Sequence, residues 1–182
     1  MKANKILLII QTALMYVSMI LVYTPIIRMF WTKDDNPIAA GMMISGAAIA
    51  GVCLLIAVAI YVLSIITIFK KQVVDSSQFT MIIKFTLIPW YIANFVLWVL
   101  LVGGMLNPFL ILGIPIIIAL SVIGTYMFMF SSTLNNICTI FAELKNKTLN
   151  PSGLLIAGMI LQFFFCLDAL GAIFTFIKCQ KR

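Results

Sequence analysis

The sequence predicts an all-α integral membrane bundle with about five transmembrane helices. Hydrophobic residues make up 64% of the 182 residues and charged residues only 9%, whereas a soluble domain averages roughly 25% charged residues. The apolar residues form long runs, and a helix needs about 20 apolar residues to cross the hydrocarbon core. About five such runs fit in the chain. We therefore expect one transmembrane domain over residues 1–182.

The first apolar run covers residues 6–27 and follows Lys2 and Lys5. It is longer than the ~7–15 residue apolar region of a signal peptide, and no clear small-x-small cleavage site follows it. The run ends shortly before a polar connection that contains Pro37. We therefore expect a retained first span.

The second run covers residues 38–69 and exceeds the ~30 Å hydrocarbon core, so the helix must tilt or continue into the interface. Its first half is rich in small residues placed four apart, a spacing that lets two helix backbones approach closely. These residues are Gly41, Ser45, Gly46, Ala47, Ala50 and Gly51. We expect them to pack helices within the bundle, with dimerisation or a glycine hinge as alternatives.

The third run covers residues 80–102 and the fourth covers residues 109–130. Lys84 stands near the start of the third run. We expect its ammonium to reach the head groups while its methylenes stay in the apolar layer. Residues 131–146 then carry an amphipathic helical stripe of Leu134, Ile137, Phe141 and Leu144. Because few lysines flank this stripe, we expect a helical extension of the fourth span into the cytoplasm rather than a helix on the bilayer surface.

The last run covers residues 154–177 and contains one acid at depth, Asp168, about 13 Å or more from the nearer end. Asn94 in the third run and Ser121 in the fourth lie at comparable depths. These three residues form a candidate intramembrane polar site. An isolated carboxylate in hydrocarbon costs about 2.5–3.5 kcal/mol on insertion scales, so we expect Asp168 to be neutral, hydrogen-bonded or facing water.

Three interpretations of Asp168 remain open. The residue can hold the bundle together by bonding to Asn94, Ser121 or a backbone group. It can form a proton- or cation-responsive site in a transport path. It can also contact a polar or basic residue of another membrane subunit.

Several function classes are disfavoured. The sequence has no histidine, so a serine or cysteine nucleophile lacks its usual base and a zinc or haem site needs rarer ligands. No G-x-x-x-x-G-K phosphate loop is present. We therefore expect no enzyme activity, no metal and no cofactor. The net charge of +7 is spread over the ends of the apolar runs, which favours anionic lipid head groups over nucleic acid as a partner.

A five-span arrangement puts the two termini on opposite sides of the membrane, and the basic residues are then divided almost evenly between the two sides. With the N-terminus inside, seven basic residues face the cytoplasm and five face outward. The positive-inside rule then favours a cytoplasmic N-terminus, although the basic C-terminal tail argues the other way.

The last third of the chain carries a resemblance. Glu-Leu-Lys-Asn-Lys-Thr-Leu at residues 143–149 precedes a polar turn and the run Ile-Leu-Gln-Phe-Phe-Phe-Cys-Leu-Asp-Ala-Leu-Gly-Ala-Ile at residues 160–173. This pattern resembles small uncharacterised multi-pass integral membrane proteins of Gram-positive bacteria. The resemblance implies a bacterial plasma membrane and no particular activity. We expect a non-enzymatic accessory component that works with a membrane-protein partner or as a homo-oligomer. A small proton- or cation-linked transporter that uses Asp168 is the alternative.

Overall fold

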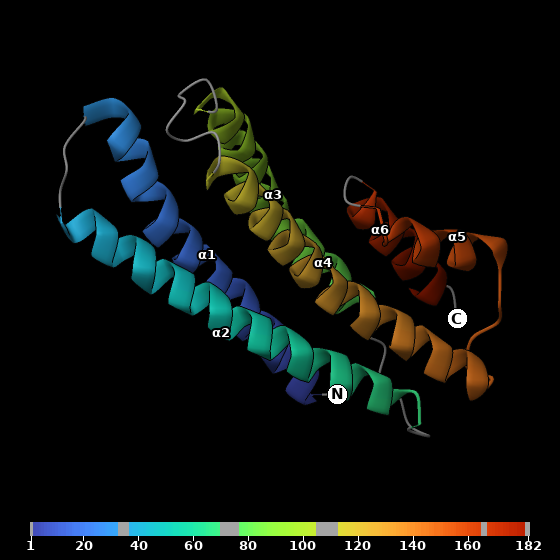
Figure 1. The fold of residues 1–182 in the computed structure, drawn as a ribbon. Coiled ribbons are helices and arrows are strands. Elements are labelled where there is room, and N and C mark those ends of the chain that lie inside the picture. Colours follow the sequence, from blue (N-terminus) through green and yellow to red (C-terminus); the bar gives the residue numbers. More distant parts are fainter. Residues whose placement is uncertain (1, 33–36, 70–76, 105–112, 165–166, 181–182) are drawn as a thin grey trace.

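The computed structural model describes residues 2–32, 37–69, 77–104, 113–164 and 167–180. The described part forms six helices, shown in Figure 1. They are α1 (Lys2–Thr32), α2 (Pro37–Thr67), α3 (Ser77–Gly104), α4 (Gly113–Lys145), α5 (Gly153–Leu161) and α6 (Asp168–Gln180). The prediction of an all-helical protein is confirmed.

Three of the helices contain a stretch long and apolar enough to cross a membrane. These stretches are Ala3–Arg28, Gly41–Thr67 and Ser77–Gly103. They correspond to the first three predicted spans. The start of the fourth predicted span, residues 109–112, lies outside the described residues.

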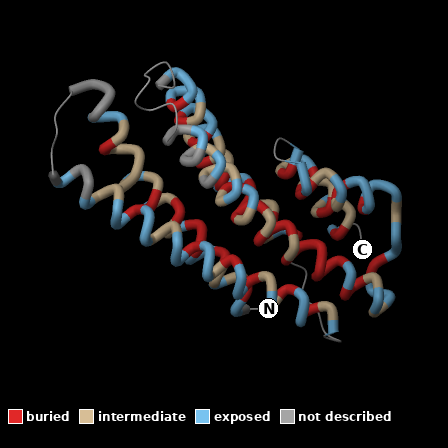
Figure 2. Tube along the Cα trace, in the orientation of Figure 1, coloured by how far each residue is buried: buried red, intermediate tan, exposed pale blue. Residues whose placement is uncertain are grey.

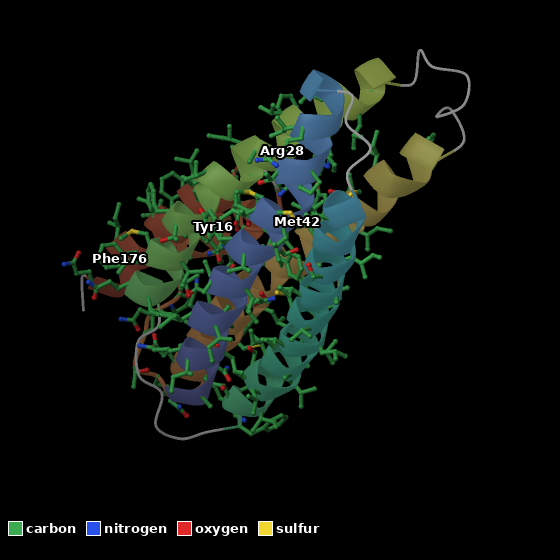
Figure 3. All side chains as sticks on the ribbon, turned by 90° about the vertical axis from the view of Figure 1, so that its left-hand side faces the viewer. Tyr16, Arg28, Met42 and Phe176 are labelled. Atoms are coloured by element: carbon green, nitrogen blue, oxygen red, sulfur yellow. The ribbon has the colours of Figure 1, made fainter. Side chains whose placement is uncertain are left out.

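Two long helix pairs and one short helical hairpin make up the bundle. Helices α1 and α2 run antiparallel along each other, and α3 and α4 form the second pair (Figure 1). Tyr16 joins the pairs, because its hydroxyl donates a hydrogen bond to the Thr86 carbonyl where α1 faces α3 (Figure 3). Helices α5 and α6 pack against each other, and α6 also packs against α3.

The second half of α4 is the most enclosed part of the chain, as Figure 2 shows. Residues 131–145 continue the helix, as the sequence predicts. The predicted amphipathic stripe does not match the burial of residues 131–141, however. Phe141 of the stripe is exposed, and all positions from 131 to 140 except Leu134 are buried, polar ones included. The polar residues point inward because α1, α2 and the α5–α6 hairpin supply hydrogen-bond partners.

The last predicted span, residues 154–177, is not one helix. Helix α5 ends at Leu161 and α6 begins at Asp168, so the chain reverses and the two helices pack side by side. Their backbones touch at two glycines. A Cβ on Gly171 would lie 2.6 Å from the Gly158 carbonyl oxygen and 2.8 Å from the Gln162 nitrogen. Gln162 and Asp168, at the ends of the two helices, are buried and hydrogen-bonded, which favours this reversal over a continuous apolar helix.

Only part of the small-residue motif in α2 packs inside the bundle. A Cβ on Gly46 would lie 2.7 Å from Val22 Cγ2, and the Ser18 hydroxyl donates a 2.9 Å hydrogen bond to the Gly46 carbonyl. Gly46 therefore marks the close approach of α1 and α2, and Ala50 is half-buried beside it. Gly41, Ser45, Ala47 and Gly51 are exposed instead. Their expected role in packing helices within the bundle is wrong.

We predict that Gly171→Ala destabilises the hairpin by about 1–3 kcal/mol, since the added methyl overlaps backbone atoms of Gly158 in α5 and of Gln162 just after it. Thermal unfolding in detergent, together with the rate of proteolysis in the 153–180 segment, measures the effect. Gly153→Ala is the matched control, because a Cβ there meets nothing within 4 Å. Equal stability of the two variants would contradict the close contact.

Candidate functional site

The interior of the bundle contains a charged pair, Lys84 of α3 and Asp168 of α6. Both side chains are almost completely buried, with 0% and 2% of their surfaces exposed. The Lys84 ammonium donates hydrogen bonds to Asp168 Oδ1 and, at 2.8 Å, to Thr133 Oγ1 of α4. The expectation that Lys84 extends to the head groups is therefore wrong. An opposite charge and a hydroxyl inside the bundle make burial of the ammonium tolerable.

Asp168 is positioned by the start of its helix. It is the first residue of α6, where a negative side chain complements the positive end of the helix dipole. The Thr133 hydroxyl lies 3.3 Å from Asp168 Oδ1 and 3.2 Å from the Gln162 carbonyl oxygen at the end of α5. Thr133 thus connects α4 to both arms of the hairpin and to the charged pair.

A group of amides and a hydroxyl extends this site along α4. Asn136 Nδ2 donates to Gln162 Oε1 and to Thr175 Oγ1, each at 3.2 Å. Gln162 Nε2 donates to the Gly158 carbonyl and to Thr175 Oγ1, each at 3.3 Å. All three side chains are fully buried. These hydrogen bonds join α4 to the hairpin about one helical turn beyond Thr133, which contacts the charged pair.

Two acceptors in this site lack a hydrogen bond within the described part of the chain. They are Asp168 Oδ2 and Asn136 Oδ1, and each is buried. Buried acceptors are usually satisfied by protein or by ordered water. Asp168 therefore keeps one oxygen that can accept a further donor or carry a proton.

A second polar network lies against the opposite side of α4. Asn4 of α1 donates to Asn135 Oδ1 at 2.8 Å and lies 3.4 Å from Ser64 Oγ of α2. The Ser131 hydroxyl donates to Gln11 Oε1 at 2.9 Å. Sequence reasoning missed both networks. The available signal was the dense polar run Ser-Ser-Thr-Leu-Asn-Asn at residues 131–136, whose polar residues occupy too many faces of a helix to be one exposed side.

The structure divides the three predicted site residues into two places. Asn94 accepts a hydrogen bond from the Tyr23 hydroxyl, and the Trp98 indole donates to Ser121 Oγ at 2.9 Å. Asn94 and Ser121 line one cavity of about 200 Å³. Asp168 is not among its lining residues and bonds to Lys84 and Thr133 instead. Asn94 and Ser121 thus share a cavity, while Asp168 belongs to the charged pair.

Among the residues that the structure describes, no group of three or more histidine, cysteine or acidic side chains could hold a metal ion. The acids and bases of the site are the single pair Lys84 and Asp168. The site is therefore arranged for charge neutralisation and hydrogen bonding.

We predict that Lys84→Met and Asp168→Leu each lower the free energy of unfolding by about 3–5 kcal/mol, because each leaves an uncompensated buried charge. The double variant should lose clearly less than the sum of the two, since it removes both charges. Unfolding in detergent of all four proteins measures the coupling. Additive losses would show that the two groups do not interact.

Comparisons with known proteins add one finding. A model for a family of unknown function, DUF6652, matches residues 3–181. No curated protein matches the chain, and no solved structure does. The matched range runs through all six helices, so the bundle and the hairpin both fall within what the family model covers.

Proposed function

The chain belongs to this family of unknown function, and we propose that it is a non-enzymatic multi-pass membrane protein that acts by contact with other membrane components. The pairing of Lys84 with Asp168 carries the proposal. A transport site must release its ion or proton to water, whereas this acid is buried and balanced by a base of the same chain. Separating the two partners would leave each charge buried and unpaired, so the pair keeps α3 and α6 in contact.

The outer surface supports a contact role within the bilayer. Large apolar side chains are exposed along α1, α2 and α3, and the exposed positions follow the outer faces of these helices in Figure 2. Lipid chains are the natural neighbours of such faces. The exposed small residues of α2, Gly41, Ser45, Ala47 and Gly51, offer another helix a place to approach. A membrane-protein partner or a second copy of the chain fits this surface.

We propose four crossings, α1 to α4, with α5 and α6 entering and leaving on one side as a re-entrant hairpin. Asn4, Ser64 and Asn135 meet in one hydrogen-bonded group, which places the start of α1 beside the end of α2 and the second half of α4. Lys5 lies over the Phe79 ring at the start of α3. Cys179 of α6 packs with Ile140 of α4 in one apolar cluster. Both chain ends therefore lie toward the same end of the bundle, as in Figure 1.

This topology concentrates positive charge on one side. Nine of the twelve basic residues flank that end of the bundle in the sequence: Lys2, Lys5, Lys70, Lys71, Lys145, Lys147, Lys178, Lys181 and Arg182. Arg28, at the other end of α1 in Figure 3, and Lys33 flank the opposite side. The positive-inside rule then supports a cytoplasmic location for both termini. The same basic end is suited to anionic lipid head groups, and a bacterial plasma membrane remains our expected setting.

We predict that reporters fused to the N-terminus and to the C-terminus both report the cytoplasm. The reason is the even number of crossings combined with the charge asymmetry. A pair of reporters, one active only inside and one active only outside, makes the measurement at each end. Reporters active on opposite sides would support five spans and contradict the re-entrant hairpin.

The functional test uses two measurements on the same purified protein. After gentle solubilisation, we expect the chain to migrate with a partner or as a homo-oligomer, since contact is its proposed role. In liposomes, we expect no proton or cation flux above that of protein-free liposomes, for wild type and for Asp168→Asn alike. A lone monomer would contradict the contact role.

A transporter is the second candidate, because Asp168 Oδ2 accepts no hydrogen bond within the described part of the chain. A carboxylate oxygen in that state can take up a proton. Flux that is present in wild type and lost in a normally folded Asp168→Asn protein would replace the contact proposal with proton- or cation-linked transport. Flux that persists in this variant would exclude Asp168 as the coupling group.

A further inference from the structure

The cavity between the two helix pairs is a separate feature from the Lys84–Asp168 site. All four long helices line it, through Met15 and Met19 of α1, Cys53 of α2, Trp90 of α3, and Gly124 and Phe128 of α4. Its volume is about 200 Å³. The cavity is partly open at the protein surface, where the exposed Leu54 of α2 is one of its lining residues.

The chemistry of the lining excludes charge recognition. No acidic or basic residue is among the lining side chains. The polar groups on the wall already have partners in the protein: the Tyr23 hydroxyl bonds to Asn94, Ser121 accepts from Trp98, and Ser18 donates to the Gly46 carbonyl. A molecule in this cavity is therefore held by apolar contact rather than by an ion pair.

Sulfur atoms and aromatic rings make up about half of the remaining wall, beside the aliphatic side chains of Val22, Ala50 and Leu54. Met15, Met19 and Cys53 face the same space as Trp90 and Phe128. The Trp90 and Phe128 rings already pack edge to face, with centroids 6.0 Å apart and an interplanar angle of 76°. Ring edges and polarisable sulfur atoms are favourable neighbours of a further aromatic ring.

Gly124 keeps this space open. A Cβ at that position would meet only Phe128 Cε2, at 4.0 Å. A larger side chain would therefore extend into the cavity without overlapping backbone. An apolar cavity of about 150 Å³ is known to accept benzene, so the space beside Gly124 suits one ring or two fused rings.

We propose that this cavity binds a compact neutral aromatic molecule. The proposal does not depend on the role of Asp168, because the two sites share no lining residue. The cavity is thus a candidate binding site for a small molecule, whereas Lys84 and Asp168 bind each other.

Iodobenzene is the probe for this proposal, because its heavy atom quenches tryptophan fluorescence on contact and Trp90 lies in the cavity wall. The protein is reconstituted in lipid nanodiscs and titrated with iodobenzene. We expect a saturable component of quenching in wild type, above the linear quenching caused by iodobenzene dissolved in lipid. The absence of a saturable component would overturn the proposal.

Variants at glycine positions test where the probe binds. Gly124→Ile should abolish the saturable component, and Gly124→Ala, which adds one methyl at an ordinary contact distance, should weaken it. Gly103→Ile is the matched control, because a Cβ there meets nothing within 4 Å, and it should bind as wild type does. Elution volume and helix content confirm folding of each variant. Saturable quenching that survives in both Gly124 variants would overturn the proposal.

Competition experiments distinguish an aromatic molecule from an aliphatic molecule or a lipid chain as the occupant of the cavity. Indole should displace iodobenzene, and cyclohexane should need roughly two- to tenfold higher concentration, because it lacks ring–sulfur and ring–ring contacts. Phospholipid with brominated acyl chains provides the contrasting case. If its quenching of wild-type fluorescence falls in Gly124→Ile but not in Gly103→Ile, a lipid chain occupies the cavity and the aromatic proposal is wrong.

Discussion

The ion pair between Lys84 and Asp168 is the constraint on which the arrangement of the last third of the chain depends. Each charge is buried, and a buried charge without a partner is strongly destabilising. Helix α6 must therefore begin where its first residue meets α3, and the chain between α5 and α6 must reverse at that depth. The close contact of Gly158 and Gly171 then allows the two short helices to lie together.

Helix α4 supplies the partners that complete this arrangement. Consecutive residues on a helix point about 100° apart, so Asn135 and Asn136 face different neighbours. Asn135 bonds to α1, and Asn136 bonds to Gln162 and Thr175 of the hairpin. A single polar run thus joins the α1–α2 pair on one side and the α5–α6 hairpin on the other. Because each buried amide requires a partner, these bonds also set the register of the helices against one another.

The charged site and the cavity divide the interior into two regions with different chemistry. Around Asp168, ion pairing and amide hydrogen bonds hold α3, α4 and the hairpin together. Around Gly124, the polar groups satisfy each other and leave an apolar space among sulfur atoms and rings. The first region suits a structural and topological role. The second is where the chain has room for a molecule other than itself.

The membrane class, the helical fold and the approximate limits of the first three predicted spans all follow from the order of apolar and polar residues along the chain. These properties are local, because the length and composition of an apolar run decide whether it can cross a bilayer as a helix. The ends of α1, α2 and α3 lie within five residues of the predicted limits. Depth along a helix is also a local count, and the common depth of Asn94, Ser121 and Asp168 stays a prediction; the structure places only Asn94 and Ser121 on one cavity wall.

Which side chains meet depends on how the helices pack. Lys84 and Asp168 are 84 positions apart, and whether they face each other depends on how α3 and α6 rotate about their axes. In the same way, the rotation of α2 about its own axis buries Gly46 and exposes Gly41 and Gly51, although all three belong to one small-residue motif. The break between α5 and α6 likewise has no strong local signal, since Gln162 and Asp168 bond to partners on α3 and α4. Helix rotation and long-range pairing are properties of the packed bundle. An apolar helix has several faces that could pack equally well, and the hydrogen bonds between polar side chains select one of them.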